Sequence, residues 1–474
     1  MATLNMAFDI ASNALEADQS ALNIVSNNVA NASTPGYTQE VANWQENDPV
    51  TISGVNYGQG AEVMGPVSQR DRVLEQSLQQ QNQAASASSA RLTALDQLQS
   101  IFSQVTTADS RSSTSATNGI SQDISAFFDS LSQLESSPAD NSLRQQVLTA
   151  AGNLAGDFQA ASSQVAGQQT SLDQQSASLV SQINALTQSI AQLNVQIQST
   201  SPDSDAGTLE DQREQDISQL SQMVGIHQIQ TENNGLTVTT SSGALLVSEG
   251  QSYSLSSAPV SGVTHFYDSE GNDITTSLAS GGGEIGGLLT VRDQDIPQVQ
   301  SALDTLAFDL GTAVNTANEA GSDANGNAGV AIFSLPATSA GAAAAISVAI
   351  TSPSQIAAAG AGLGSSDDTN LLAMANLQNQ GIVSSETPAS YFSDFVSTLG
   401  SLVSQVQTQN GAQQASLTQL QNVVNSLSSV DLNDEASAMQ TLEQSYEAAS
   451  KIFTILDSVM TAALNLGVPT TYTS

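Results

Sequence analysis

Three features of this 474-residue chain carry residue types that could bind a ligand or a metal ion. The first is Gly-Gly-Gly-Glu-Ile-Gly at 281–286, which satisfies the G-x-G-x-x-G spacing of dinucleotide-binding loops. That fingerprint requires a strand before the glycines and, after them, a helix whose N-terminus holds the pyrophosphate. The residues that follow, Gly-Leu-Leu-Thr-Val-Arg-Asp, resemble a strand. We therefore interpret the glycines as a turn and not as a nucleotide site.

The second feature, at 323–334, resembles the start of a calcium-binding loop. Asp323, Asn325 and Asn327 stand at the first, third and fifth positions, where side-chain oxygens would bind Ca²⁺. However, Ala328 stands where the loop needs glycine for its sharp turn, and Ser334 replaces the bidentate glutamate. We therefore expect an Asn/Gly turn here and no metal site.

The third feature is the pair of histidines, His227 and His265, since histidine is a common metal ligand and general base. The chain has no cysteine, so a closed zinc site would need both histidines together with carboxylates. Both lie in or beside predicted strands, and the simpler interpretation places them on the surface of a sheet. No Ser/His/Asp arrangement can be recognised either. The sequence thus predicts no catalytic, cofactor-binding or metal-binding residues, and we do not expect an enzyme.

The charge and hydropathy of the chain exclude further classes of partner. A count of 45 acidic against 8 basic residues gives a formal net charge of −37, and a surface this negative repels nucleic acid. The most apolar stretch, Ala-Gly-Ala-Ala-Ala-Ala-Ile-Ser-Val-Ala-Ile, is far shorter than the ~20 residues that cross a bilayer. No basic residue precedes Arg70, so the N-terminus lacks the positive region of a cleaved signal peptide. We expect neither nucleic acid nor membrane as a partner.

Apolar side chains spaced alternately by three and four residues predict helices at both ends of the chain. The N-terminal row, which Asp18 interrupts, is Leu4, Phe8, Ala11, Leu15, Leu22, Val25 and Val29. The C-terminal row is Met439, Leu442, Tyr446, Ala449, Phe453, Leu456, Met460 and Ala463, with a second row beside it formed by Ile452, Ile455, Val459 and Leu466. Such a wide apolar face can contact more than one neighbour.

The interior shows more helical rows, among them Leu172, Leu179, Ile183, Leu186, Ile190, Leu193 and Ile197, and Ile296, Val299, Leu303, Leu306 and Leu310. Between these rows, residues 227–255 alternate between apolar and polar around Asn-Gly, which predicts a hairpin, and residues 263–278 predict a strand, a Gly-Asn turn and a short strand. The expected fold is mainly α with an inserted small β domain. In it, the two terminal helices form a coiled-coil-like terminal domain on a long helical bundle. The predicted divisions are a terminal domain at 1–36 with 433–474, a helical body at 37–225 with 291–320 and 368–432, a β domain at 226–290, and an irregular Gly/Ala-rich segment with short strands at 321–367.

Thr34-Pro35-Gly36-Tyr37 predicts a firm end to the first helix. Pro35 has a fixed φ and pushes Thr34 out of the helical region, and Gly36 can adopt φ > 0, so the four residues fit a type II turn. Just before the turn stand Asn27, Asn28 and Asn31. Their amides could cap their own helix or bond to amides of a neighbouring chain, and the sequence leaves both alternatives open.

The segment that contains this turn, Ser-Asn-Asn-Val-Ala-Asn-Ala-Ser-Thr-Pro-Gly-Tyr at 26–37, resembles the N-terminal signature of bacterial flagellar axial proteins. Residues 428–466 are similar to the paired C-terminal signature of those proteins. Three further blocks, including 179–197, resemble the hook-associated protein 1 family, and they follow in the same order. The chain departs from the family pattern at Ser33, where Asn is usual, and at Leu442, where Tyr is common.

This resemblance implies a structural component of the flagellum that forms the ring joining hook to filament. It implies export by the flagellar type III system to an extracellular location, without a cleaved signal peptide. The implied partners are further copies of the chain, the flagellar hook protein, hook-associated protein 3, and an export chaperone at the C-terminal helix. The alternatives are a hook or distal rod protein and, from another class, an extracellular enzyme such as a peptidoglycan hydrolase.

The expected assembly interface combines the helical rows with the asparagines. We expect the ends of the free subunit to stay unpaired until neighbouring subunits cover them, because the double C-terminal row offers more surface than one N-terminal row can cover. The interface residues are Leu4, Phe8, Leu15, Leu22, Val25, Val29, Asn27, Asn28, Asn31, Leu442, Tyr446, Phe453, Leu456 and Met460, with the junction turn at Thr34, Pro35, Gly36 and Tyr37.

Overall fold

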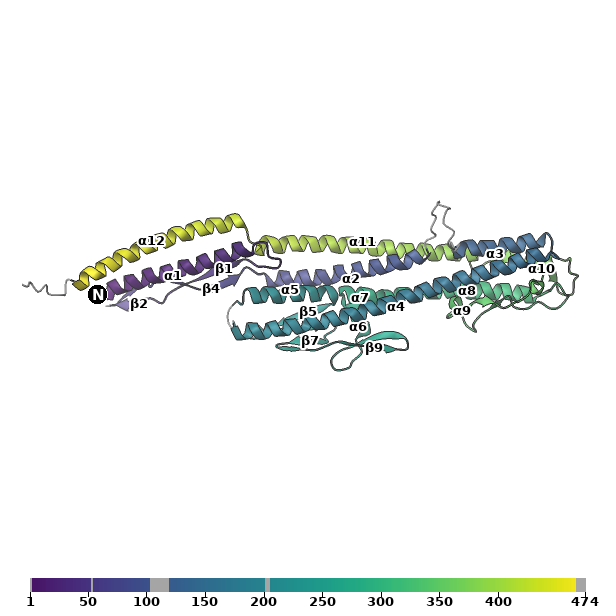
Figure 1. Ribbon diagram of the computed structural model, residues 1–474, viewed down its shortest axis with the longest axis horizontal. Helices are drawn as coiled ribbons and strands as arrows, with labels where there is room; N and C mark the ends of the chain where they lie inside the picture. The colour runs from purple at the N-terminus through teal and green to yellow at the C-terminus, as the bar shows by residue number, and fades with distance from the viewer. Residues whose placement is uncertain (1, 53, 103–118, 201–204, 466–474) are drawn as a thin grey trace, which may run out of the picture.

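The structure, a computed structural model, describes residues 2–52, 54–102, 119–200 and 205–465. The molecule is a long rod with a narrow end and a thicker body (Figure 1). The narrow end holds the first and the last helix, and the body holds the long helices between them with small sheets on one side. The expected helical fold with a small β insertion is confirmed.

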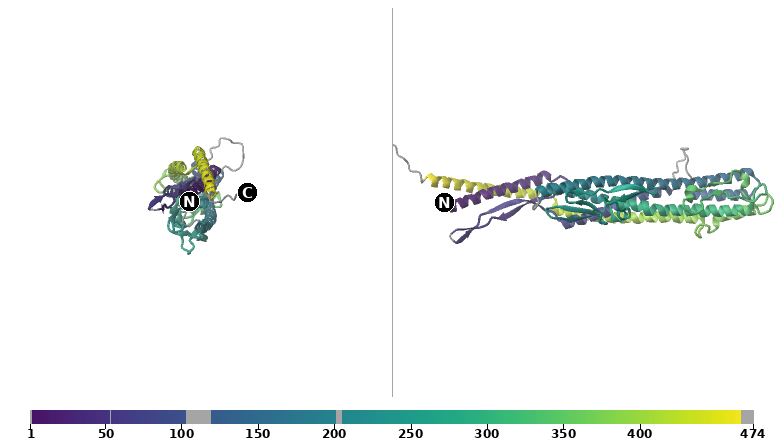
Figure 2. Two further views of the ribbon diagram at one scale, coloured as in Figure 1. Left: turned by 90° about the vertical axis from the view of Figure 1, so that its left-hand side faces the viewer. Right: turned by 90° about the horizontal axis from the view of Figure 1, so that it is seen from below.

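The narrow end is built on the pairing of α1 (Ala2–Asn31) with α12 (Leu432–Asn465), which lie side by side (Figures 1 and 2). The ring of Phe8 lies against that of Phe453, with centroids 4.5 Å apart. The expectation that the two ends stay unpaired is therefore wrong for this structure. Ala11, Ala17 and Ala21 are buried along α1, which packs on α12 and also on β1 and β4.

Four strands follow α1, where the sequence predicted that a helical body begins at residue 37. The longer two form an antiparallel pair beside α1, and the shorter two form a hairpin at its end. β-Branched residues such as Val41 and Thr51 favour strands, and Gly54 and Gly60 adopt φ of +82°, which other residues rarely do. The strands are β1 (Glu40–Glu46), β2 (Val50–Ile52), β3 (Val55–Tyr57) and β4 (Ala61–Ser68).

The body consists of long helices packed along the rod, as the helical rows predicted. Its longest helix, α4, has 60 residues and spans about 90 Å at 1.5 Å per residue. Of its predicted row, Leu172, Ile183, Ile190 and Ile197 are almost fully buried. The principal helices are α2 (Arg72–Phe102), α3 (Ile120–Glu135), α4 (Asn141–Thr200), α5 (Thr208–Met223), α8 (Ile296–Glu319) and α11 (Pro388–Ser428).

The predicted hairpins of the β insertion are present and pack on α4. Four strands form an antiparallel meander and two more form a separate hairpin. Asn233 and Asn234 adopt the left-handed φ that the first turn needs. His227 and His265 lie in strands, as expected. The strands are β5 (Ile226–Gln230), β6 (Leu236–Thr240), β7 (Leu245–Ser248), β8 (Gln251–Ser252), β9 (Ser256–Val260) and β10 (Val263–Tyr267).

The last part of the predicted β region is helical, which corrects two expectations. α6 (Thr275–Gly281) replaces a short strand, and α7 (Gly283–Thr290) with a π-helical turn (Val291–Asp295) replaces the strand expected after the glycines. Glycine allows the close packing of this helix, because a Cβ on Gly287 would lie 2.2 Å from the carbonyl oxygen of Ala87 in α2. The nucleotide fingerprint still fails, since a helix and not a strand precedes the glycines.

The segment after α8 has little regular structure, as expected, and its strands are only two residues long. The carboxylate of Asp323 accepts the backbone N–H groups of Asn325 and Asn327, each at 2.8 Å. It thus closes the predicted Asn/Gly turn. The elements here are β11 (Gly321–Ser322), β12 (Phe333–Ser334), α9 (Ala342–Ala345), β13 (Ser347–Val348), a 3-10 turn (Pro353–Gln355), β14 (Ala359–Gly360), α10 (Thr369–Asn376) and a second 3-10 turn (Leu377–Asn379).

Candidate assembly surface and interdomain joint

The two apolar rows predicted on α12 differ in exposure. In the first row Ala449 is buried, and Phe453, which contacts α1, is half-buried with Leu456 and Met460. The second row stays open: Ile452, Ile455 and Val459 are 54%, 62% and 47% exposed. These three residues form what we call the outer strip of α12. Leu466, assigned to this row, lies outside the described residues, as does the side chain of Ala463.

The predicted residues of α1 are less available to a neighbour than the sequence indicated. Val25 is buried and Val29 is 40% exposed, whereas the other predicted apolar residues of this row are half-buried. On α12 Leu442 is half-buried and Tyr446 is 39% exposed. The half-buried residues of α1 are Leu4, Phe8, Leu15 and Leu22.

Asn28 is the polar centre of the narrow end and is only 1% exposed. Its amide nitrogen donates to the carbonyl oxygen of Glu40 at 2.7 Å and to Oε1 of Glu435 at 2.8 Å. Its amide oxygen accepts the hydroxyl of Tyr37 at 2.8 Å and the backbone N–H of Glu40 at 3.0 Å. One side chain therefore ties α1, the turn, β1 and α12 together. It does not cap its own helix, and in this chain its bonding groups are already used.

Asn31 and the junction turn show the local alternative. The Asn31 amide donates to the carbonyl and side-chain oxygens of Asn27 at 3.1 and 2.9 Å, and it accepts the Thr34 hydroxyl at 3.2 Å. The backbone N–H of Tyr37 donates to the Thr34 carbonyl at 3.2 Å, and Gly36 has φ of +80°. The predicted type II turn is therefore present, while Thr34, Pro35 and Gly36 remain exposed.

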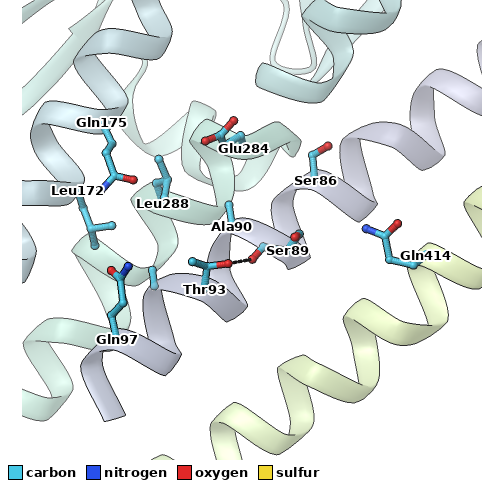
Figure 3. Close-up of a pocket in the computed structure, with 11 residues that line it drawn as sticks. Ser86, Ser89, Ala90, Thr93, Gln97, Leu172, Gln175, Glu284, Leu288 and Gln414 are labelled. Carbon is cyan, nitrogen blue, oxygen red and sulfur yellow. Dashed lines mark hydrogen bonds between the residues drawn. The ribbon is translucent and has the colours of Figure 1, made fainter. Parts of the chain in front are cut away.

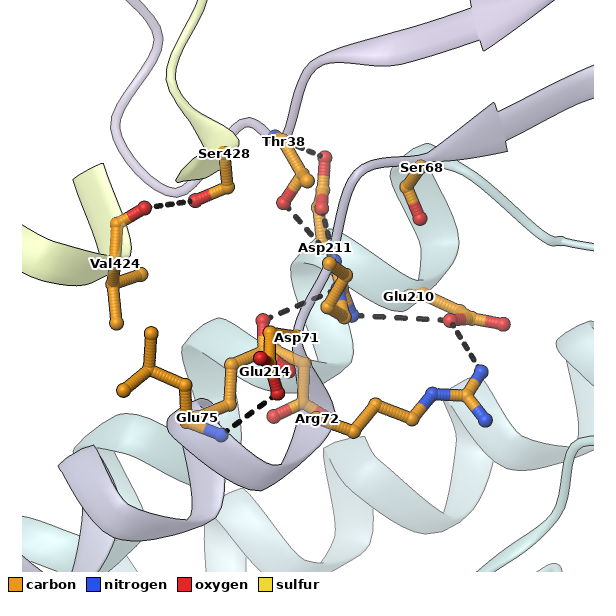
Figure 4. Close-up of polar contacts among 12 residues, drawn as sticks. Thr38, Ser68, Asp71, Arg72, Glu75, Glu210, Asp211, Glu214, Val424 and Ser428 are labelled. Carbon is orange, nitrogen blue, oxygen red and sulfur yellow. Dashed lines mark hydrogen bonds and ion pairs between the residues drawn. The ribbon is translucent and has the colours of Figure 1, made fainter. Parts of the chain in front are cut away.

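Hydrogen bonds connect the narrow end to the body at three places, which together we call the joint. The backbone N–H of Thr38 donates to Asp211 of α5 at 3.1 Å, and the backbone and hydroxyl of Ser68 both donate to Asp205, at 2.6 and 2.5 Å. The third place is the end of α11, where the N–H of Gln39 donates to the carbonyl of Ser428 at 2.8 Å. Figure 4 shows these segments converging on the start of α5.

Beneath the joint lies a buried network of charges centred on Arg70. Its guanidinium is 3.2 Å from Glu75 and 3.8 Å from Glu210, and it also bonds to Asp211. Burial raises the pKa of Glu75 to about 8, although the neighbouring Arg70 opposes the shift. Burial also raises the pKa of Glu214. A polar cavity of about 170 Å³ lies within the network.

Sequence reasoning missed this network, although one signal pointed to it. Arg70, Arg72 and Arg213 all line the cavity, and they are three of only 8 basic residues in the chain. In so acidic a protein the rare bases are the positions where carboxylates can be neutralised. Their partners, however, come from α2 and α5, which only the fold brings together.

Another polar cavity, of about 310 Å³, lies between α2, α4, α7 and α11 (Figure 3). Its walls carry hydroxyl and amide groups from residues such as Ser89, Thr93 and Gln175, with Glu284 on α7. Within the described residues no three His, Asp or Glu side chains gather closely enough to hold a metal ion. Over the same residues, no helix combines the length and apolarity that a bilayer span requires.

Two family models match the chain. Residues 105–333 match the helical domain of the flagellar hook-associated protein FlgK, and residues 8–38 match the flagella basal body rod protein family. The second match covers most of α1 and the junction turn. The first covers α3, α4, α5, the β insertion and α8.

Curated relatives carry the same description. The chain is 29% identical to flagellar hook-associated protein 1 of Escherichia coli (strain K12) over 68% of its own length and 58% of that protein. It is 25% identical to flagellar hook-associated protein 1 of Bacillus subtilis (strain 168) over 98% of its length and 99% of that protein. The chain thus matches less than two thirds of the enterobacterial relatives' length.

A solved structure shares the fold. The flagellar hook junction protein FlgK from Burkholderia pseudomallei superposes with a TM-score of 0.66 at 20% identity. The superposition covers 73% of this chain and 99% of the solved one. At this level of identity the likeness concerns the arrangement of helices and sheets.

Proposed function

We propose that the chain is a member of the flagellar hook-associated protein 1 family and a structural subunit of the junction between flagellar hook and filament. The match of residues 105–333 to the FlgK helical domain and the likeness to two proteins named flagellar hook-associated protein 1 support this proposal. The observation that carries the proposal is the outer strip of α12. Three large aliphatic side chains lie exposed on a helix whose neighbouring face is already paired with α1. A second copy that covered the strip would remove this apolar surface from water, at roughly 25 cal/mol per Å².

Copies of the chain form a ring in this proposal, with the narrow ends meeting at its centre. The remaining predicted interface residues of α12, Leu442 and Tyr446, extend the contact toward the joint. The terminal domain at 1–36 with 433–474 acts as one unit because α1 and α12 are paired. The joint transmits force between the ring and the body, so the function is mechanical. The ring joins the hook, a tube that bends, to the filament, a tube that does not.

The finer partners are proposals of the same kind. The ring contacts the flagellar hook protein on one side and hook-associated protein 3 on the other. Before export through the flagellar type III system, a cytoplasmic chaperone covers the C-terminal helix, whose outer strip is the most apolar surface it offers. The assembled protein is extracellular and no signal peptide is removed.

Two other assignments are less favoured. A hook or distal rod protein would share the terminal segments but would lack the long α4–α5 pair. A peptidoglycan hydrolase would need converging catalytic groups, whereas the two cavities described above are lined by hydroxyls, amides, Glu284 and the Arg70 network. An assay of the purified protein on peptidoglycan separates this class, because any turnover would contradict a purely structural role.

The junction role is tested by deleting the gene and complementing the strain. Cells without the gene should bear hooks and shed flagellin monomers. Complementation with Ile455→Asp should leave this defect, because a carboxylate in the outer strip cannot be covered by an apolar neighbour.

Ile229→Asp is the matched control. Ile229 is 59% exposed on β5, close to the 62% of Ile455, but it belongs to the β insertion of the body and not to the narrow end. Complementation of the deletion strain with Ile229→Asp should restore swimming. Filaments in the Ile455→Asp strain, or hooks missing from the deletion strain, would contradict the proposal.

A further inference from the structure

A groove of about 280 Å³ runs between α8 and α11 in the body. Its floor is apolar and includes Val299 and Ala302 from α8 with Phe395, Leu399 and Leu402 from α11. It belongs neither to the narrow end nor to the joint. The assembly role proposed above therefore makes no use of it.

The rim of the groove carries negative charge that the described residues do not neutralise. Of its carboxylates, Asp295 is paired with Arg91 at 2.9 and 3.0 Å. Glu386 and Asp394 take part in no ion pair within the part of the chain that the structure describes. Oε2 of Glu386 is buried and has no hydrogen-bond partner. A buried oxygen without a donor is costly, so this position would be stabilised by a cation supplied from outside.

The charge around the groove also changes the pKa of Tyr391, which lines the groove from α11. Burial raises the pKa of the Tyr391 hydroxyl, and the charges of Asp309 and Glu386 raise it further, against a hydrogen bond to Thr305. The tyrosine therefore stays neutral. It offers an aromatic face and a donor beside the carboxylates.

An apolar floor below unneutralised carboxylates fits a long side chain with a cationic end. The methylene stem of such a side chain can lie on Phe395 and Leu399, while its head group reaches Glu386. A guanidinium suits this position better than an ammonium, because it is more weakly hydrated, stacks on aromatic rings and can bond a carboxylate with two N–H groups.

We propose that this groove binds an arginine side chain presented by a partner protein that is not a copy of this chain. A second copy has little to offer, since it carries only 8 basic residues against 45 acidic ones. Most of those described are already paired or buried, and Arg72 is bonded to Glu210 and Gln230. Lys451, on α12, is exposed, but it carries an ammonium in place of the preferred guanidinium, and it lies in the narrow end. The already paired or buried ones are Arg70, Arg91, Arg144, Arg213 and Arg292.

The test begins with butylguanidinium as the probe, titrated into the full chain with labelled Leu and Val methyl groups. The methyl signals of Val299, Leu399 and Leu402 should shift with a dissociation constant on the order of millimolar, as expected for one charge-assisted pair on an apolar floor. Butyrate, with the same stem and the opposite charge, should leave them unchanged. Absence of shifts with butylguanidinium, or equal shifts with butyrate, would overturn the proposal.

The double variant Glu386→Gln/Asp394→Asn separates the groove from the general attraction of cations to an acidic protein. It should weaken butylguanidinium binding about tenfold or more, whereas Glu319→Gln, an exposed position on α8, the other helix that lines the groove, should leave it unchanged. Equal binding of butylguanidinium by both variants would show that it is attracted to the acidic surface as a whole and not to the groove, and it would refute the site. The double variant is expected to fold, because neither carboxylate is ion-paired and Oε2 of Glu386 has no donor to lose.

Two tripeptides, acetyl-Leu-Arg-Leu-amide and acetyl-Leu-Glu-Leu-amide, extend the test from a side chain to a polypeptide. The arginine peptide should shift the same methyl signals and compete with butylguanidinium, and the glutamate peptide should not. If butylguanidinium binds while the arginine peptide does not, the groove admits only small cations and the proposed protein partner is wrong. None of these outcomes depends on the flagellar role.

Discussion

Replacing Asn28 by alanine tests whether one buried amide holds the narrow end together. The substitution removes four hydrogen bonds, to Tyr37, to the backbone N–H and carbonyl of Glu40, and to Glu435. At about 1 kcal/mol net per bond the loss would be about 4 kcal/mol. Glu435 keeps one donor, since the Gln39 amide lies 2.8 Å away, so we expect about 3 kcal/mol.

This loss should be local, because all four bonds lie in the narrow end. Amide hydrogen exchange in α1 measures it directly. Opening of α1 that is easier by about 3 kcal/mol should speed exchange there by roughly 100-fold, with no change in α4. Asn31→Ala is the matched control, since Asn31 bonds only to Asn27 and Thr34 at the end of its own helix. It should speed exchange only in the last turn.

A second measurement follows the packing of the two helices. The chain has no cysteine, so spin labels on introduced cysteines at the exposed positions Glu16 and Glu447 would be unique. Their distance distribution should be narrow in the parent and in Asn31→Ala, and broad in Asn28→Ala. Exchange in α1 and a label distance that are the same for Asn28→Ala and Asn31→Ala would refute the assignment of Asn28 as the centre of the narrow end.

Three further predictions concern other parts of the molecule. Burial, together with the charge of Asp123, raises the pKa of Asp157 to about 6, so the folded state binds a proton more tightly than the unfolded chain and stability falls as pH rises from about 4 to 6. Asp157→Asn should remove this slope in urea unfolding and stabilise the protein at pH 7 by about 1 kcal/mol, allowing for partial solvent exposure; an unchanged slope would contradict the assignment. Gly287→Ala should destabilise the body, because its Cβ would lie 2.2 Å from the Ala87 carbonyl oxygen; a melting temperature unchanged from the parent would show that α2 and α7 can separate at little cost. Pro35→Ala should change monomer stability by only about 1 kcal/mol yet reduce swimming in soft agar, because the exposed turn sets the angle after α1; a mutant that unfolds several degrees lower but swims normally would reverse that expectation.

The helical character of the protein could be predicted from periodicity alone. The rows on α4, α8 and α12 could be recognised because apolar residues recur every three or four positions. Residues with this spacing share one face of a helix, and that face is the one that packs against a neighbouring element. The turn at Thr34–Tyr37 could also be predicted, because its cause is local: Pro35 fixes its own φ, and Gly36 can adopt a positive φ. The order of sequence blocks, in turn, carried the family resemblance.

Local patterns failed where packing outweighed propensity. Leu288, Leu289 and Val291 read as a strand, yet they are helical and buried because Gly286 and Gly287 allow the backbone to lie directly against α6 and α2. The strands after α1 were missed because β2 and β3 have only three residues each and because β1 and β4 do not alternate strictly between apolar and polar residues. For α7 a deciding contact comes from α2, which is distant in sequence, whereas the strands pair with each other beside α1.

The sequence by itself determined that the chain is helical at both ends, that its first helix stops at Pro35, and that it carries apolar rows with few positive charges. Only the tertiary structure decided which residues these helices, rows and charges contact. It placed the Asn28 amide between Glu40 and Glu435, which lie 12 and 407 residues away, and it brought Arg70 to the carboxylates of α5. It also decided which row of α12 is covered by α1 and which stays exposed. The physical reason is that periodicity specifies the faces of a helix, whereas the partner of each face depends on how the whole chain folds back on itself.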